Sequence, residues 1–521
     1  MTLGIGVGAN TAIFSGVYAY LGTPLPYPQP EKLVWLEETR GPKTAQLATV
    51  SWLDAQDWKS VTALKSIALF RLGRMRYGPS GAQYVTCINA TADLFPALGT
   101  APQLGRVPAT GDNGYSRSAV ITGGLWRGNF GATPNVIGQS VELNGQHFTV
   151  TAVLPSDFNF LYLDTGVFLP LEPPSQASDR RDNRVFSAIG RIRSDANLAQ
   201  LQGVIASISA RLERESPQTN FGWAAHVTTL EDFLIPRNSR VGAVTALAAV
   251  SLVLAIACAN VASLLLSRGV TRRKEMAIRV ALGASAKDLR SLLLSESMLL
   301  AIGGGILGIV IAYAGIPILK SVTPAGTPRM EAMQLNLSAL LYTALVSVAA
   351  GILSGIAPVW SLSGESTIEV LRRGGPGNTG SDQRALKTLV VLQIAIVIVL
   401  MTATGLLIRS LQHQLAASPG FNKNNLLIAQ VALPERKYRS SALTANYYRE
   451  LLNSLSRQPH IQSAAATDAL PIGACGPFVL VAIEGQPSAG PRDQSTACRF
   501  RITPGFFRTL EIPMLKGREN Q

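Results

Sequence analysis

The sequence contains few of the residues that build most enzyme and metal sites. Its 521 residues include only 4 histidines and 4 cysteines, and no two cysteines form a CxxC pair, which argues against a zinc site. No G-x-x-x-x-G-K-[ST] loop occurs, so the phosphate-binding loop of an ATPase is missing. Neither a Ser-His-Asp arrangement nor a pair of acids is apparent. We therefore expect no catalytic, cofactor or metal site in the chain.

Charge is also scarce, and long stretches have none. Charged residues make up 15% of the chain, compared with about 25% in a typical soluble domain. Four apolar runs contain no charged residue, and a fifth begins near the N-terminus: 241–266, 297–319, 336–363, 388–408 and 2–21. About 20 apolar residues suffice for a helix to cross a membrane. The sequence predicts a multi-pass α-helical membrane protein with five spans.

The first of these spans is predicted to be partial. A signal peptide carries positive residues before its apolar core, but residues 1–20 contain neither lysine nor arginine. We expect this run to be the later part of a transmembrane helix whose beginning is missing.

Basic residues in the short loops predict the orientation. The loop 267–296 carries seven lysines and arginines and the loop 365–387 carries four, whereas 320–335 carries two. The positive-inside rule places the first two loops in the cytoplasm and the third outside. Residues 22–240 and those after about 411 then lie outside as well. Lipid headgroups also explain the net charge of +14 more simply than nucleic-acid binding does.

The first large segment outside the membrane is predicted to be mixed α/β. Residues 140–154 alternate apolar and polar side chains on both sides of Asn144-Gly145, the pattern of a β-hairpin with a two-residue turn. Residues 118–122 are a predicted strand. Residues 198–215 have helical periodicity and end before a proline, so we expect a helix there.

Part of this segment recurs near the C-terminus. Residues 88–106 and 500–518 align without gaps and share five identities, at Thr91, Phe95, Leu98, Gly105 and Arg106 in the first copy. Both copies follow an apolar run, so the order of span and outer domain repeats. The second copy is expected to be incomplete.

Glycines four residues apart occur in the third and fourth predicted spans. Gly304 and Gly308 lie in one run, and Gly351 and Gly355 lie in the next. Such spacing lets helix backbones approach closely, so we assign these glycines to helix packing. Ordinary glycine enrichment in transmembrane helices remains an alternative for either pair.

The spans contain no Asp, Glu, Lys, Arg or His, which argues against an ion-coupled transporter or a charged pore. Only three side chains are strongly polar at depth: Asn10, Asn260 and Gln393. Each is expected to form hydrogen bonds between helices.

The loop after the second long run is predicted to form an amphipathic helix pair, 272–285 and 286–296, at the cytoplasmic surface. Its first half reads RRKEMAIRVALGAS. A helix lying on lipid is one interpretation, and a docking element for a cytoplasmic partner is the other. We assign docking to six residues: Arg272, Glu275, Met276, Arg279, Val280 and Gly283, the last as a break or bend.

At this segment the sequence resembles a known family. The pattern R-x-x-E-x-A-I-R-x-A-L-G-A-S at 272–285 is similar to that of FtsX/MacB-type permeases of ABC transporters. Residues 8–34 resemble the first span and the start of the outer domain of that family, and residues 119–155 resemble its MacB-like periplasmic core domain. The repeat resembles the duplicated form of these permeases, with two periplasmic domains and eight spans. Against that pattern the chain is expected to be truncated.

The resemblance implies a non-catalytic permease subunit of a bacterial plasma-membrane transporter. A separate cytoplasmic ABC ATPase dimer would bind the ATP, and the spans would carry movement to the periplasmic domains. Such mechanotransmission would serve export or efflux; control of an envelope enzyme, signalling and lipoprotein release are alternatives. Expected partners are the ATPase, the bilayer and a periplasmic adaptor or envelope protein, but no nucleic acid. A ligand-binding receptor without an ATPase is a further alternative, against which the docking helix argues.

The predicted domain plan follows from these assignments. It comprises a partial first transmembrane helix (1–21), a MacB-like periplasmic core domain (22–240), an FtsX-like permease domain with three spans (241–363) that includes the amphipathic segment 268–296, a cytoplasmic linker (364–387), a fifth span (388–410) and a truncated second core domain (411–521).

Overall fold

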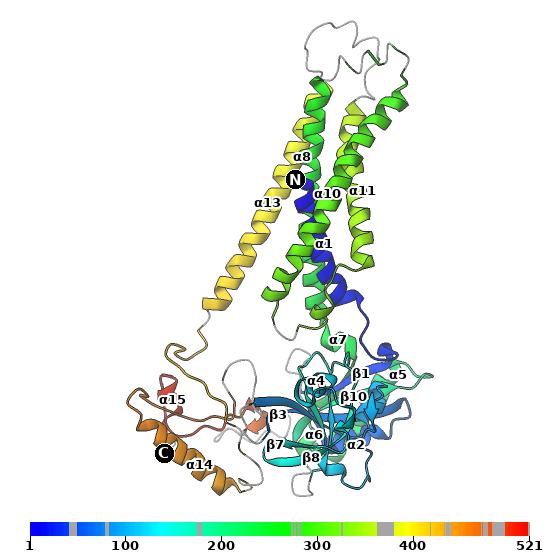
Figure 1. Ribbon diagram of the computed structural model, residues 1–521. Helices are drawn as coiled ribbons and strands as arrows, with labels where there is room; N and C mark the ends of the chain where they lie inside the picture. The colour runs from blue at the N-terminus through cyan, green and yellow to red at the C-terminus, as the bar shows by residue number, and fades with distance from the viewer. Residues whose placement is uncertain are drawn as a thin grey trace. The chain divides into compact units, whose positions relative to one another are not determined.

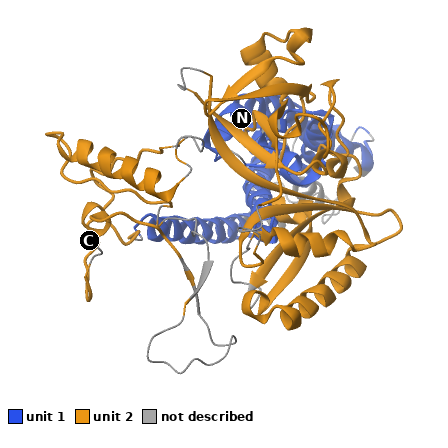
Figure 2. Cartoon of the chain, turned by 90° about the horizontal axis from the view of Figure 1, so that it is seen from below, with its two compact units in different colours: residues 1–24, 235–416 blue, residues 25–234, 417–521 orange. Residues whose placement is uncertain are grey.

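The computed structural model describes most of the chain: residues 1–40, 49–78, 83–174, 180–271, 275, 278–279, 282, 284–324, 327–361, 380–416, 418–431, 433, 438, 440–469, 471, 478–481 and 495–518. These residues form two compact units, which Figure 2 shows in different colours. Unit 1 contains residues 1–24 and 235–416, and unit 2 contains residues 25–234 and 417–521.

Unit 1 is a bundle of long helices (Figure 1). The helices are α1 (Thr2–Val17), which continues as a π-helical turn η1 (Tyr18–Gly22), α8 (Arg237–Thr271), α10 (Ala286–Val322), α11 (Leu337–Ser361) and α13 (Gly380–Ala416), with a short 3-10 turn η5 (Met330–Ala332). Among the described residues, α8, α10, α11 and α13 are long and apolar enough to cross a membrane. Together with the mixed α/β unit described below, they confirm the predicted fold class.

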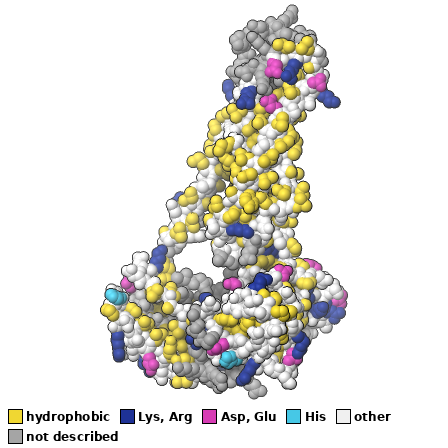
Figure 3. Space-filling view, in the orientation of Figure 1, with side chains coloured by type: hydrophobic (Ala, Val, Ile, Leu, Met, Phe, Trp, Pro, Cys, Tyr) yellow, Lys and Arg dark blue, Asp and Glu magenta, His cyan; other side chains and the backbone are white. Residues whose placement is uncertain are grey.

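Apolar side chains cover the middle of this bundle, whereas charged side chains gather at one end (Figure 3). That distribution is expected for helices that lie in hydrocarbon and end at a polar interface. The chain therefore spans the membrane several times, and the helices of unit 1 provide the spans.

Unit 2 is built on an eleven-stranded sheet in residues 25–234. The strand order is β11-β1-β10-β3-β4-β9-β6-β8-β5, with β2 paired to β10 and β7 paired to β3 and β8. Neighbouring strands are antiparallel except for the pairs β4–β9 and β6–β8. The strands are β1 (Leu33–Arg40), β2 (Val50–Ser51), β3 (Leu64–Tyr77), β4 (Gln83–Ala90), β5 (Leu104–Gly105), β6 (Ser118–Ile121), β7 (Ser140–Leu143), β8 (Gln146–Val153), β9 (Val167–Pro170), β10 (Arg184–Ile192) and β11 (Trp223–Thr229).

Helices pack against this sheet, and apolar side chains fill the space between the layers. One buried cluster joins aromatic side chains such as Trp35, Phe70 and Phe168, and another packs Trp58 and Ile205 against the sheet. The helices are α2 (Trp52–Lys59), α3 (Leu94–Leu98), α4 (Gly123–Phe130), α5 (Leu198–Glu215), α6 (Pro217–Asn220) and α7 (Leu230–Leu234), with 3-10 turns η2 (Pro30–Lys32), η3 (Tyr115–Arg117) and η4 (Pro134–Val136).

Three local predictions for this domain are confirmed. Strands β7 and β8 form the hairpin, and its turn residues Asn144 and Gly145 have φ angles of 52° and 74°, as a type I′ turn requires. The predicted helix is α5, and a capping box at Asn197 caps its N-terminus. The predicted strand at 118–122 is β6.

The described C-terminal residues form α14 (Ser441–Ser456), β12 (Phe478–Val481), β13 (Ser495–Cys498) and α15 (Phe506–Thr509). The hydrogen bonds repeat those of the first copy. Thr91 N donates to Leu69 O at 2.9 Å and Leu69 N donates to Thr91 Oγ1 at 3.1 Å; Thr503 and Ala466 exchange the same two bonds at 3.0 and 2.8 Å. The aligned Gly105 and Gly517 both have positive φ. The predicted repeat is therefore also a repeat of local structure.

Candidate functional site

The segment assigned to docking lies between α8 and α10. Among its six predicted residues, Arg272, Met276, Val280 and Gly283 lie outside the described residues. Glu275 and Arg279 are helical and form an ion pair one turn apart, with Arg279 Nη2 2.7 Å from Glu275 Oε1. Both side chains are about half exposed, so they remain accessible to a partner.

The second half of the predicted amphipathic pair is not a separate helix. Residues 286–296 form the first turns of α10, which continues without interruption through the third span. Ser285 begins this helix by a capping box with Asp288, whose carboxylate accepts a hydrogen bond from Ser285 N at 2.8 Å. No glycine or proline interrupts residues 286–296, so helix propagation favours one continuous rod. The segment to which docking is assigned therefore joins a span directly at Ser285.

Helix α10 packs against α1 with very little space between their backbones. A Cβ added at Gly308 would lie 2.8 Å from Val7 Cγ1 and 3.1 Å from Gly8 N, and one added at Gly304 would lie 3.0 Å from Leu3 Cβ. The partner helix contributes the same spacing, because Cβ atoms at Gly4 and Gly8 would lie within 3 Å of α10. The predicted pair on α10 thus faces a second glycine pair, the arrangement that allows close crossing in membranes.

The other predicted glycine pair, on α11, faces α10 as well. A Cβ at Gly351 would lie 3.0 Å from Ala301 Cβ, and one at Gly355 would lie 2.6 Å from Ser297 Oγ. Helix α10 is therefore held between α1 and α11 through glycines on both sides.

A polar contact between α1, α8 and α11 fixes their register inside the bundle. Asn10 is 1% exposed; its Nδ2 donates to Val250 O at 2.7 Å, and its Oδ1 accepts from Ser251 Oγ and Tyr342 Oη, each at 3.2 Å. Phe14 stacks on Tyr342 with 3.8 Å between ring centroids. The interhelical role predicted for Asn10 is confirmed. Asn260 and Gln393 form no hydrogen bond to another helix within the described part of the chain.

The loop between α10 and α11 packs against the end of α1. Arg329 is 3% exposed and its Nη1 donates to Tyr20 O at 2.9 Å, in the π-helical turn that ends α1. Met333 is fully buried against Ala19 and Ile316. Beyond this turn the chain continues to Leu25 and Tyr27, which are buried in the apolar core of unit 2.

Unit 2 contains a buried ionic cluster that no sequence pattern predicted. Glu38 of β1, Asp54 of α2 and Arg184 of β10 have side chains that are at most 6% exposed. Arg184 Nε donates to Glu38, and Arg184 Nη2 lies 3.5 Å from Asp54 Oδ2. The guanidinium also lies 4.0 Å from the ring centroid of Trp223. Because up to 146 residues separate these side chains, only the strand order of the sheet brings them together.

Further polar side chains extend this cluster toward the surface. Arg181 binds both Asp54 and Asp57, the latter at 2.8 Å, and Arg211 lies 3.3 Å from Asp57. Asn220 Nδ2 donates to Asp54 Oδ2 at 3.0 Å. The cluster therefore links α2, α5 and α6 to the sheet.

The two buried carboxyl groups differ in their affinity for a proton. Burial raises the pKa of Glu38 well above its usual value; the charge of Arg184 opposes this rise and that of Asp54 adds to it. Burial also acts to raise the pKa of Asp54, but hydrogen bonds with Glu38 and Arg181 bring it below its usual value. Of the two carboxyl groups, Glu38 therefore binds a proton more readily than Asp54 does.

An apolar pocket in unit 2 is lined by side chains that include Phe95, Val107, Tyr115 and Phe168. Its empty volume is about 270 Å³, below the roughly 300–1,000 Å³ of ordinary small-molecule sites. In the described residues no group of His, Cys, Asp and Glu side chains could hold a metal ion.

Known protein families match both the core domain and the helix bundle of this chain. The pattern of the MacB-like periplasmic core domain matches residues 1–208, and that of the FtsX-like permease C-terminal domain matches residues 247–367. The macrolide export ATP-binding/permease protein MacB of Agrobacterium fabrum is 25% identical over 261 residues. This match covers 50% of the chain but only 39% of that protein.

Two solved structures are similar to part of the chain. The periplasmic region of MacB from Actinobacillus actinomycetemcomitans is 14% identical with a TM-score of 0.29, and the match covers 39% of this chain and 90% of that one. The extracellular domain of the noncanonic ABC-type transporter YknZ from Gram-positive bacteria is 15% identical with a TM-score of 0.29, covering 37% and 99%.

The two domain matches define the class of protein, a membrane permease that contains a MacB-like core domain in addition to its spans. The chain is an FtsX/MacB-type ABC transporter permease.

Proposed function

We propose that the chain is the non-catalytic, membrane-spanning subunit of a MacB-like exporter. A separate cytoplasmic ABC ATPase dimer binds and hydrolyses ATP, and this subunit carries the resulting movement to its periplasmic core domain. The chain itself binds no cofactor. A periplasmic adaptor or another envelope protein completes the assembly on the outer side.

Contacts within unit 1, followed by the covalent chain from α1 into unit 2, support this proposal. Helix α10 begins at Ser285, directly after the docking segment, and packs closely against α1 through the facing glycine pairs. Helix α1 ends in the turn that Arg329 holds, and the chain then enters the core domain at Leu25. A displacement of the docking segment can therefore be transmitted along α10 to α1, and from α1 through the chain to the core domain. That route is the main observation behind the proposed function.

The proposed orientation places the docking segment in the cytoplasm of a bacterial cell and the core domain outside its inner membrane. We expect a cysteine at exposed Thr149 to react with a membrane-impermeant thiol reagent in intact spheroplasts, and a cysteine at exposed Leu282 to react only after lysis. The four native cysteines would be replaced beforehand. Equal labelling of both positions before lysis would contradict the orientation.

The coupling role predicts that charge reversal in the docking segment abolishes ATPase binding. The double variant Arg272→Glu and Arg279→Glu should lose co-purification with the ATPase while inserting into the membrane normally. Both positions are changed together because an exposed ion pair contributes only about 1 kcal/mol or less.

The matched control reverses two exposed charges of the core domain, Arg193→Glu and Asp195→Lys, which form a surface pair. This control should bind the ATPase like the unaltered chain. Unchanged binding of the docking-segment variant would instead identify residues 272–285 as a lipid-surface helix.

A second candidate function uses the same movement to regulate an envelope enzyme, to signal or to release lipoproteins. The close packing of α1, α10 and α11 favours it, because glycine contacts leave little room for a substrate path between these helices. ATPase stimulation by exported drugs or peptides would support export, whereas stimulation only by an envelope protein would support regulation.

A further inference from the structure

Three consecutive glycines, Gly303, Gly304 and Gly305, lie in the middle of helix α10. A glycine weakens a helix relative to alanine, because its backbone is freer to change conformation. Packing explains two of the three: a Cβ at Gly304 would lie 3.0 Å from a Cβ atom of α1, and one at Gly305 would lie 2.6 Å from Ser347 Oγ of α11. A Cβ at Gly303 would meet nothing within 4 Å, so packing does not require a glycine there.

The packing partner of α10 changes at this glycine triplet. On its N-terminal side α10 packs against α11, where a Cβ at Gly351 would lie 3.0 Å from Ala301 Cβ. On its C-terminal side it packs against α1, where a Cβ at Gly308 would lie 2.8 Å from Val7 Cγ1. Helices bend sharply at glycine and serine positions. A bend at the triplet would therefore move the half that follows the docking segment while the other half stays packed on α1.

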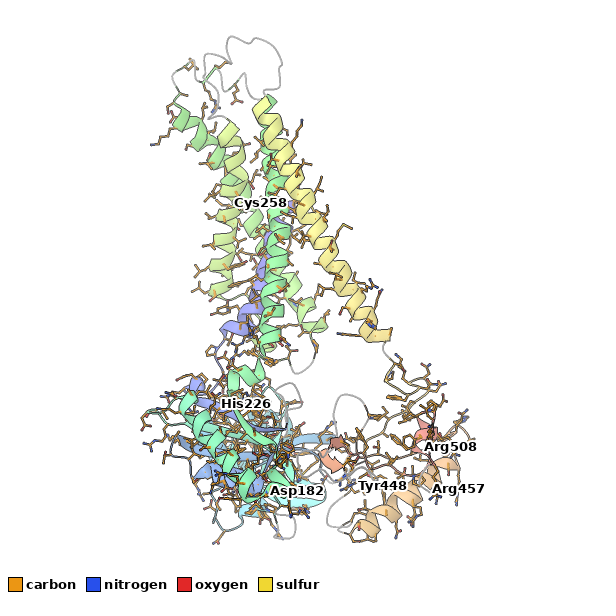
Figure 4. All side chains as sticks on the ribbon, turned by 180° about the vertical axis from the view of Figure 1, so that it is seen from behind. Asp182, His226, Cys258, Tyr448, Arg457 and Arg508 are labelled. Atoms are coloured by element: carbon orange, nitrogen blue, oxygen red, sulfur yellow. The ribbon has the colours of Figure 1, made fainter. Side chains whose placement is uncertain are left out.

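The hydroxyl group of Ser347 faces the triplet and has no hydrogen-bond partner among the described residues. The residue is 7% exposed. Other buried hydroxyl groups of α11 are paired: Thr343 donates to Ala339 O at 2.7 Å, and Ser354 donates at 3.2 Å to the backbone oxygen of Cys258, which Figure 4 labels in the helix bundle. An unpaired polar group is unfavourable inside a membrane bundle, so a second state that pairs Ser347 would gain stability.

We propose that α10 has a straight and a bent state, that the glycine triplet is the point of bending, and that Ser347 is a positioning residue that stabilises the bent state. Bending opens hydrogen bonds of the helix backbone at the triplet. A hydroxyl group both donates and accepts, so Ser347 pairs with a backbone group that bending releases at Gly305. This inference deepens the proposed function, because the ATPase on the docking segment would shift the balance between the two states.

Pulsed electron paramagnetic resonance on the full chain in lipid nanodiscs tests for the two states without the ATPase. In a chain without native cysteines, spin labels at Lys287→Cys and Leu345→Cys report the distance between the N-terminal end of α10 and α11; both side chains are exposed. Dilution with unlabelled chain removes distances between copies. We expect two distance populations, of which the bent state is the minor one.

Gly303→Ala should reduce the minor population severalfold, because alanine favours the straight helix. Gly315→Ala is the matched control on α10. A Cβ at Gly315 also meets nothing within 4 Å, so this variant gains the same helix propensity away from the triplet and should leave both populations unchanged.

Ser347→Ala separates the positioning role from packing. It should reduce the minor population severalfold without lowering the melting temperature, because the hydroxyl group that it removes has no partner in the straight state. The control Ser354→Ala, on the same helix, loses a hydrogen bond to α8. It should lower the melting temperature and leave the two populations unchanged.

Three outcomes would overturn the proposal. A single distance population in the unaltered chain would mean that α10 does not bend. Equal effects of Gly303→Ala and Gly315→Ala would mean that the triplet is not the point of bending. Equal losses of melting temperature in Ser347→Ala and Ser354→Ala would mean that the Ser347 hydroxyl group is already paired in the straight state. None of these measurements uses the ATPase, so their failure is distinct from a failure of the chain to bind one.

Discussion

Replacing Gly308 with valine is expected to separate α1 from α10 and to destabilise the helix bundle strongly. The new Cβ would lie 2.8 Å from Val7 Cγ1 and 3.1 Å from Gly8 N, and the backbone of α1 cannot yield as a flexible side chain can. Overpacking typically costs about 1–3 kcal/mol, and a contact against backbone places this site at the upper end. The measurement is thermal unfolding of the purified full chain in one detergent.

Gly315 provides the matched control on the same helix. A Cβ at Gly315 would meet nothing within 4 Å, so Gly315→Val changes the helix propensity by the same amount without a clash. We expect its melting temperature to stay near that of the unaltered chain. Equal destabilisation by the two variants would show that helix propensity, and not the crossing with α1, determines the effect.

This crossing also shows what the sequence could and could not predict. The spacing of Gly304 and Gly308 is visible in the sequence, because a helix places residues four apart on one face. Their partners Gly4 and Gly8 have the same spacing, but periodicity alone does not say which of several apolar helices pack together. The partner choice depends on tertiary contacts between residues about 300 positions apart.

The core domain likewise contains both features that the sequence predicts and features that it does not. The hairpin around Asn144-Gly145 was predictable because its register depends on a two-residue turn. The cluster of Glu38, Asp54 and Arg184 was not, because β1 and β10 are neighbours in the sheet but distant in the chain. The continuous helix α10 was missed for another reason: charged residues at 287–290 suggested a surface helix, although no helix breaker separates them from the span.

Replacing Arg184 with methionine is expected to destabilise the core domain by about 3–5 kcal/mol, as the removal of one partner from a buried ion pair does. Methionine keeps much of the side-chain volume but leaves Glu38 and Asp54 without the cation between them. The loss should appear as earlier cleavage of residues 25–234 in pulse proteolysis of the full chain across a urea series. Arg193→Met, at an exposed ion pair, is the control and should change the midpoint little.

The pH dependence of this loss separates charge from packing. The pKa of Glu38 is already raised in the folded chain, and removal of Arg184 should raise it further. A carboxyl group with a raised folded pKa stabilises the fold fully below its unfolded pKa, near 4.5, and this stabilisation is lost as the pH rises through the folded pKa. The deficit of Arg184→Met should therefore be smaller at about pH 5 than at about pH 8, because a proton neutralises Glu38 in place of the arginine. A deficit of equal size at both pH values would mean that the guanidinium acts by packing on Trp223 and not by compensating the buried carboxyl groups.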